Sequence, residues 1–201
     1  KMTLIENDRN MKQAYSRYIA YNQTDDDEIC IMLDGDDWLY DEHVLSKLNN
    51  LYTERDINVT YGGFVKYENN CTDLHINAHA EFPDEVVMNK SYRTYTKYKT
   101  NGIKYTPWIS QHMRTVRSHI IKQIPKEHLM FQGKWLKAVT DQAEMFFALE
   151  HSDRKHCNNG FTGYVYNVDS SKSFGNSSFN RDKNAVWGYY HQRVKQYLKG
   201  L

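Results

Sequence analysis

The sequence has few cysteines, almost no net charge and no long apolar run. Its three cysteines, Cys30, Cys71 and Cys157, have neither the spacing of a metal site nor the even number of a disulfide framework. A formal net charge of +1 gives no overall field that would attract nucleic acid or a membrane surface. No stretch approaches the roughly 20 apolar residues of a membrane-spanning helix. These absences argue against a disulfide scaffold, a nucleic-acid-binding protein and a membrane span, and they leave the redox compartment open.

The size and composition fit one globular unit. A hydrophobic content of 40% is enough for a core, and 201 residues is about the length of one domain. Because the chain has no repeat, low-complexity tract or linker, we expect a single domain over residues 1–201. The apolar stretch within residues 1–6 is too short for a signal peptide, and the sequence assigns no compartment.

Residues 29–39 are the centre of the chain's organisation, because a short apolar run ends there in three carboxylates. Residues Ile29–Leu33 are predicted to form a buried strand, since the run is short, partly β-branched and bounded by charge. Asp34, Asp36 and Asp37 would then lie at its carboxyl end, where open α/β sheets bind ligands. Such a cluster suits Mg²⁺ or Mn²⁺ shared with substrate phosphates. The alternative is an ordinary acidic turn in which an Asp caps the next helix.

The remaining pattern is typical of an α/β protein. Hydrophobic periodicity predicts helices over Arg9–Tyr21 and after Asp41, the latter with Leu45 facing inward, and a polar, irregular stretch over residues 69–101. The other predicted elements are strands over Val59–Tyr67, His112–Arg117 and Phe161–Val168, and helices over Ser118–Ile124, Asp141–His151 and Ala185–Lys199. The predicted helix caps are Asp41, Ser118 and Thr140.

Residues 33–39 have the sequence LDGDDWL and follow an amphipathic helix that contains Asn10 and Ala14. This segment resembles the acidic motif of family 2 GT-A glycosyltransferases, which binds a divalent metal and the nucleotide-sugar donor. The resemblance implies a GT-A (Rossmann-like) mixed sheet flanked by helices, a UDP-sugar donor, and Mn²⁺ or Mg²⁺ as cofactor. Only 33 residues precede Asp34, too few for the unit that carries the family's uracil pocket, so we expect a fold that lacks its N-terminal nucleotide-binding strands.

Later segments agree with the same family in order and spacing. Residues 61–67 resemble the strand after the acidic motif, and residues 112–117 resemble a His-x-Arg-Thr-Phe strand beside the acceptor. Residues 140–144 stand where the family has an acidic residue that opens a helix under the acceptor. Residues 166–173 resemble a Tyr-x-x-His-x-x-Ser element, with Asp169 in place of the histidine. The resemblance therefore covers nearly the whole chain.

On the donor side, the resemblance implies that Asp36 and Asp37 bind the metal. Asp169 is the expected third ligand, because a carboxylate can replace imidazole on Mn²⁺. Asp34, Asp36 and Trp38 are expected to contact the donor, Asp34 through ribose or sugar hydroxyls. A loop over residues 170–176 offers Lys172 and Asn176 to the diphosphate. An ordinary solvated turn is the alternative for that loop.

On the acceptor side, Asp141 is the expected catalytic base if the reaction inverts configuration, and Glu144 is the second candidate. With retention, Asp141 would orient or stabilise instead, and it can also be a plain carboxylate at a helix N-terminus. His112 and Arg114 alternate along a strand and would face either the acceptor cleft or solvent. Trp108 and Trp38 can stack on sugar faces or belong to the core.

The narrower resemblance is to the collagen-modifying glycosyltransferases of giant viruses. It implies transfer of glucose from UDP-glucose to galactosyl-hydroxylysine, with a glycan or collagen-like glycoprotein as partner. The aromatic closing helix, with Trp187 and Tyr197 among its residues, can be a homodimer face or core. From a different class, the alternative function is a non-catalytic carbohydrate- or partner-binding module on a degenerate GT-A fold.

Overall fold

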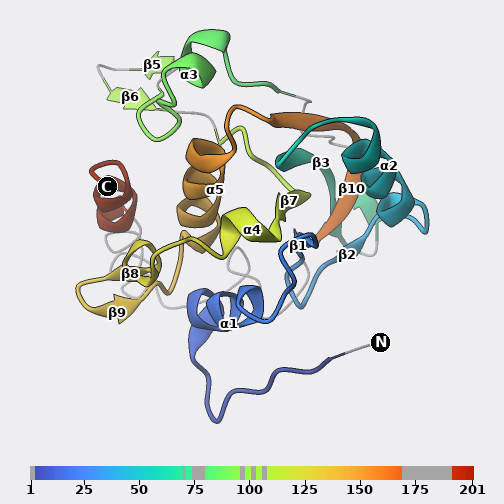
Figure 1. Cartoon of the computed structure of the whole chain (residues 1–201), viewed down its shortest axis with the longest axis horizontal. Coiled ribbons are helices and arrows are strands. Elements are labelled where there is room, and N and C mark those ends of the chain that lie inside the picture. The colour runs from blue at the N-terminus through green and yellow to red at the C-terminus, as the bar shows by residue number, and fades with distance from the viewer. Residues whose placement is uncertain are drawn as a thin grey trace.

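The computed structural model describes residues 3–69, 71–73, 80–95, 98–100, 103–105, 108–168 and 192–201. Over these residues the chain is a mixed α/β protein in which helices flank a curled sheet (Figure 1). In the main sheet the strand order is β1-β7-β3-β10-β2, and β4 pairs with β3. The strands of this sheet are β1 (Ile29–Met32), β2 (Trp38–Leu39), β3 (Val59–Glu68), β4 (Cys71–Asp73), β7 (Arg114–Arg117) and β10 (His156–Asn167).

The sheet is mixed because β3 and β10 run parallel, whereas its other pairs are antiparallel. Two small antiparallel pairs lie apart from it, namely β5 (Tyr98–Thr100) with β6 (Ile103–Tyr105) and β8 (Met130–Phe131) with β9 (Lys134–Trp135). The helices are α1 (Lys12–Tyr21), α2 (Val44–Glu54), α3 (Asp84–Met88), α4 (Ser118–Ile121) and α5 (Thr140–His151), with a 3₁₀ helix, η1, over Lys126–Leu129. Residues 192–198 are also helical. No helix in the described part of the chain is long and apolar enough to cross a membrane.

Helices α2 and α5 cover opposite faces of the sheet (Figure 1). On the α2 side, Val44 and Leu48 pack with Phe64 of β3 and Tyr164 of β10. On the α5 side, the neighbouring strand residues that face the helix include Val59, Met32 and Val116. This alternation of core residues along the strands is what a sheet buried on both faces requires.

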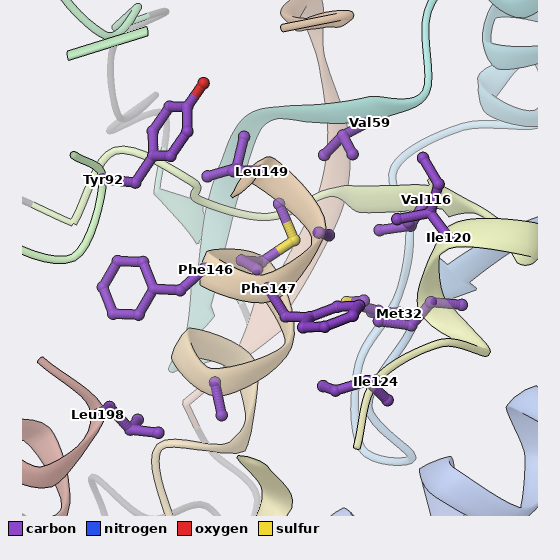
Figure 2. Packing of buried hydrophobic residues seen from close by; sticks show 14 of the residues in the cluster. Met32, Val59, Tyr92, Val116, Ile120, Ile124, Phe146, Phe147, Leu149 and Leu198 are labelled. Atoms are coloured by element: carbon purple, nitrogen blue, oxygen red, sulfur yellow. The ribbon is translucent and has the colours of Figure 1, made fainter. Parts of the chain in front are cut away.

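Helix α5 is the centre of the larger core, because its residues 143–149 are all buried. Figure 2 shows Phe146 and Phe147 projecting from different sides of the helix, Phe147 toward Met32 and Ile124. A helix that is apolar on most of its circumference needs neighbours on several sides. The sheet, α4 and the helix at 192–198 supply them, the last through Leu198. The first turn of α5 is thereby held in a fixed position beside the end of β1.

The predicted strand at the chain's centre is confirmed over Ile29–Met32, where buried and half-buried residues alternate, but Leu33 lies outside it and is 42% exposed. The strand forms an edge of the sheet. β1 pairs with β7, where Cys30 lies opposite Val116 and Met32 opposite Arg114. Cys30 and Met32 are buried in the larger core cluster, and Ile31 packs on the other face. Among the described residues, no strand pairs with the opposite edge of β1.

Several local predictions need correction. The strand expected over His112–Arg117 begins at Arg114, and Leu45, expected to face inward, is 51% exposed. None of the predicted caps, Asp41, Ser118 and Thr140, is the N-cap residue. Ser118 and Thr140 are instead the first residues of their helices, and the Ser118 hydroxyl is within hydrogen-bonding distance of that of Thr24. Tertiary contacts therefore replace the local caps that the sequence suggests.

A close contact between β3 and β10 gives a first prediction. A Cβ on Gly62 would lie 2.1 Å from Oδ1 of Asn159, whose side chain is itself buried. We expect Gly62→Ala to lower the free energy of unfolding by about 1–3 kcal/mol, as overpacking usually does. Urea denaturation would measure this, with Gly35→Ala as control, because a Cβ there meets nothing within 4 Å.

The second substitution Asn159→Ala should recover much of that loss, since it removes the atoms that clash. An unchanged unfolding midpoint for Gly62→Ala alone would contradict the close packing of these two strands.

Candidate functional site

The three carboxylates lie in a turn directly after β1, at its carboxyl end, as the sequence predicts. The turn is closed by a hydrogen bond of 3.2 Å from the backbone N–H of Asp37 to the carbonyl oxygen of Asp34. The chain then enters β2, which pairs with β10. The turn is therefore held between two strands of the sheet.

Asp34 and Asp37 are both occupied by partners. Oδ1 of Asp34 accepts hydrogen bonds from Nε2 of Gln13 at 2.6 Å and from Nη2 of Arg17 at 2.5 Å. Asp37 accepts the Tyr164 hydroxyl on Oδ2 at 2.5 Å and the backbone N–H of Asn167 on Oδ1 at 2.8 Å. Burial raises the pKa of Asp37, although both hydrogen bonds oppose the rise.

Asp36 differs from its two neighbours. Its side chain is half-exposed, and within the described part of the chain its carboxylate makes neither a hydrogen bond nor an ion pair. A carboxylate with unoccupied oxygens beside two that are engaged is the one best able to take a ligand from solution. The turn thus presents Asp36 outward and holds Asp34 and Asp37 in place.

The N-terminal half of α5 supplies two more carboxylates, and their surroundings differ. Asp141 remains 32% exposed and accepts a hydrogen bond from Nη1 of Arg114 at 3.0 Å. Glu144 is fully buried and accepts from Nη1 of Arg17 at 2.7 Å and from the Tyr21 hydroxyl at 2.9 Å. Burial raises the pKa of Glu144, although the charge of Arg17 opposes the rise. Of the two, Asp141 is the carboxylate that a substrate can reach.

Arg114, the first residue of β7, and His112, which precedes the strand, lie together. Nη2 of Arg114 is 3.1 Å from Nδ1 of His112, and the His112 ring stacks on Tyr164 at 4.3 Å between centroids. A guanidinium can only donate, so Nδ1 of His112 accepts and Nε2 carries the proton. Burial, and then the charge of Arg114, lowers the pKa of His112 well below its ordinary value. His112 is therefore a neutral hydrogen-bond donor.

The two candidate tryptophans have different environments. Trp108 packs edge-on against Phe146 of α5 at 5.6 Å, and its buried Nε1 has no acceptor among the described residues. Trp108 therefore belongs to the core, which was the alternative to a sugar-stacking role. Trp38 is 39% exposed beside the acidic turn and touches Tyr67 edge-on at 5.1 Å, so it remains the better candidate for a sugar platform.

Sequence reasoning missed the residues of α1 that join these groups. Gln13, Arg17 and Tyr21 recur every four residues, which places them on one face of the helix. That spacing was a usable signal, but the predicted helix was assigned by its apolar residues alone. Tyr164 was also missed, because nothing local marks a strand tyrosine as a partner of Asp37.

Lys195 is a further missed residue near Asp141. The helix at 192–198 buries Val194 and Leu198, and Nη1 of Arg93 donates to the carbonyl oxygen of Leu198 at 2.9 Å. Burial lowers the pKa of Lys195, while the nearby carboxylate of Asp141 opposes this. The closing helix therefore places a partly buried cation within electrostatic range of Asp141.

The described residues alone do not form a complete metal site. Within them, no group of three or more His, Cys, Asp or Glu side chains could hold an ion. Asp36 with Asp37 fits the mode in which one or two carboxylates share a divalent cation with substrate phosphates. The predicted third ligand, Asp169, and the donor residues Lys172 and Asn176 lie outside the described residues.

The structure thus brings Asp34, Asp37, His112, Arg114, Asp141 and Glu144 into one set of polar contacts at the end of β1, and the unengaged Asp36 lies in the same turn. It combines an outward-facing acidic turn, a neutral donor, and a reachable carboxylate fixed by a buried arginine. Comparison with protein-family models and with curated proteins finds no match for this chain.

Proposed function

We propose that this protein is a metal-dependent glycosyltransferase that moves a hexose, glucose in the narrower proposal, from a UDP-sugar to an acceptor hydroxyl. The observation that carries the proposal is that the three carboxylates of the acidic turn have different surroundings. Asp36 has its oxygens available, whereas Asp34 and Asp37 are fixed by Arg17 and Tyr164. An acidic turn that served only as a helix cap would not need two carboxylates anchored to distant elements.

In this proposal Asp36 and Asp37 hold Mn²⁺ or Mg²⁺, with Asp169 as a third ligand. The bound ion would neutralise charge on the departing diphosphate. Asp34 positions the turn and meets the donor's hydroxyls with its remaining oxygen.

On the acceptor side, Asp141 receives the hydroxyl proton if configuration inverts, or orients the acceptor if configuration is retained. Arg114 holds Asp141, and Nε2–H of His112 donates to a substrate oxygen.

We propose the GT-A architecture as the finer description of this mixed α/β fold. Support comes from the position of the acidic turn at the carboxyl end of β1 and from α5 opening beside it. The edge of β1 that pairs with no strand in the described ranges is where the family's nucleotide-binding strands would pair. An edge strand this apolar, without the lysine or proline that protects exposed edges, suits pairing with another strand.

A panel of UDP-sugars tests the function. With Mn²⁺ present, UDP release above the uncatalysed rate for one sugar would support the proposal, and galactosyl-hydroxylysine peptide as acceptor would test the narrower substrate assignment. No release and no Mn²⁺-dependent UDP binding would contradict it. Calorimetric glycan binding without UDP, metal or turnover would support a carbohydrate-binding module instead.

A further inference from the structure

Arg17 connects the acidic turn to helix α5. Its Nη2 donates to Oδ1 of Asp34 at 2.5 Å, and its Nη1 donates to Oε2 of Glu144 at 2.7 Å. The side chain is only 13% exposed, and Glu144 is fully buried. One planar cation therefore joins two carboxylates that are 110 positions apart in the sequence (144 − 34).

The geometry of the guanidinium makes this link directional. Its N–H groups leave in fixed directions, so holding Glu144 with one nitrogen determines where the other can meet Asp34. A lysine ammonium is a compact point charge that cannot span both positions with fixed angles. Arg17 thus transmits the position of the buried α5 helix to the first residue of the acidic turn.

The position of Asp34 in turn affects the rest of the turn. Its carbonyl oxygen accepts the backbone N–H of Asp37, and its backbone N–H donates to the Tyr164 hydroxyl at 3.2 Å. The same hydroxyl donates to Asp37. A shift of Asp34 would therefore move Asp37 and Asp36, which is costly for an ion whose ligand geometry must be close to ideal.

We infer that Arg17 is a positioning residue that sets the affinity of the acidic turn for a divalent metal and nucleoside diphosphate. This inference rests on the proposed function. It assigns to Arg17 a role beyond that of a buried ion pair, which would stabilise the fold and leave ligand affinity unchanged once folding is complete.

The chain offers a matched control on the same face of α1. The Tyr21 hydroxyl donates to the other oxygen of Glu144, at 2.9 Å, and makes no contact with Asp34. Tyr21→Phe therefore removes one hydrogen bond to the buried carboxylate and leaves both hydrogen-bond acceptors of Arg17 in place. Gln13→Ala does the reverse, because Gln13 donates to Asp34 and not to Glu144.

The experiment measures Mn²⁺-dependent UDP binding by calorimetry, and unfolding by urea, for wild type, Arg17→Lys, Arg17→Met, Gln13→Ala and Tyr21→Phe. We expect Arg17→Met and Arg17→Lys to raise the Kd at least tenfold and Gln13→Ala to raise it severalfold. Tyr21→Phe should lower stability and leave the Kd within twofold of wild type. If Arg17→Met does not fold, Arg17→Lys and Gln13→Ala carry the test.

Equal Kd values for wild type, Arg17→Lys and Gln13→Ala would overturn the inference, as would a Kd in Tyr21→Phe raised as much as in Arg17→Lys. Absence of Mn²⁺-dependent UDP binding in wild type would overturn the proposed function itself, and this role with it. The two failures are thereby distinguishable.

Discussion

Replacing Asp36 with alanine is expected to reduce UDP-sugar turnover by at least about 10²–10³-fold and to remove Mn²⁺-dependent UDP binding. A metal that neutralises a departing diphosphate contributes several kcal/mol to the transition state, and each 1.4 kcal/mol is about a factor of ten in rate. Because no described residue pairs with the Asp36 carboxylate, its loss should change the free energy of unfolding by less than about 0.5 kcal/mol. Loss of function would therefore occur in a folded protein.

UDP release and calorimetry with Mn²⁺ and UDP provide the measurement, and urea denaturation provides the stability check. Asp41→Ala is a suitable control, since Asp41 is a nearby carboxylate whose ion pair with Lys47, at 3.0 Å, lies on the surface. Asp41→Ala should leave UDP release and Mn²⁺-dependent UDP binding unchanged. Full turnover in Asp36→Ala would show that the acidic turn is not the metal site.

The acidic turn and its strand could be predicted because their signals are local. Ile29–Met32 is a short apolar run with charge on both sides, and the carboxylates follow it directly. The helix of α5 was likewise visible in the spacing of its apolar residues. Such patterns depend on neighbours in sequence, so one chain is enough to identify them.

The partners of the carboxylates could not be predicted, because they come from distant elements. Asp34 is held by residues of α1, and Asp37 by Tyr164 of β10. Glu144 is held by Arg17 and Tyr21 of α1, more than 120 residues earlier. Glu144, the second candidate for the catalytic base, is fully buried. Which carboxylate remains available is a property of tertiary packing, and sequence spacing does not determine it.

The starts of α4 and α5 also show that a local sequence signal can be overridden by tertiary packing. Thr140 and Ser118 have the residue type of a cap, but each begins its helix and lies in the interior. Short polar side chains favour caps because they can bond the free backbone N–H groups. Here tertiary packing takes them inside, so local preference was a poor guide to their position.

Asp141 and Glu144 lie one turn apart on α5, and exchanging each for its amide should produce different phenotypes. Asp141→Asn should lower turnover by about 10²–10⁴-fold, the usual contribution of a positioned general base. It should also lower stability, though less than Glu144→Gln, because the buried Arg114 loses a carboxylate partner that is itself 32% exposed. Glu144→Gln should cost about 3 kcal/mol of folding free energy, because it leaves the buried charge of Arg17 with Asp34 as its remaining partner.

Turnover with a UDP-sugar and acceptor, together with urea denaturation of both variants, would separate the two roles. The two variants can be compared directly, because both residues lie on α5 and both interact with Arg114. Each substitution replaces one carboxylate oxygen with an amide nitrogen. If Glu144→Gln kept wild-type stability and lost turnover while Asp141→Asn kept turnover, the assignment of chemistry to the exposed carboxylate would be wrong. Loss of turnover in Asp141→Asn, together with the larger loss of stability in Glu144→Gln, would mean that Glu144 holds Arg17 and Asp141 meets the substrate.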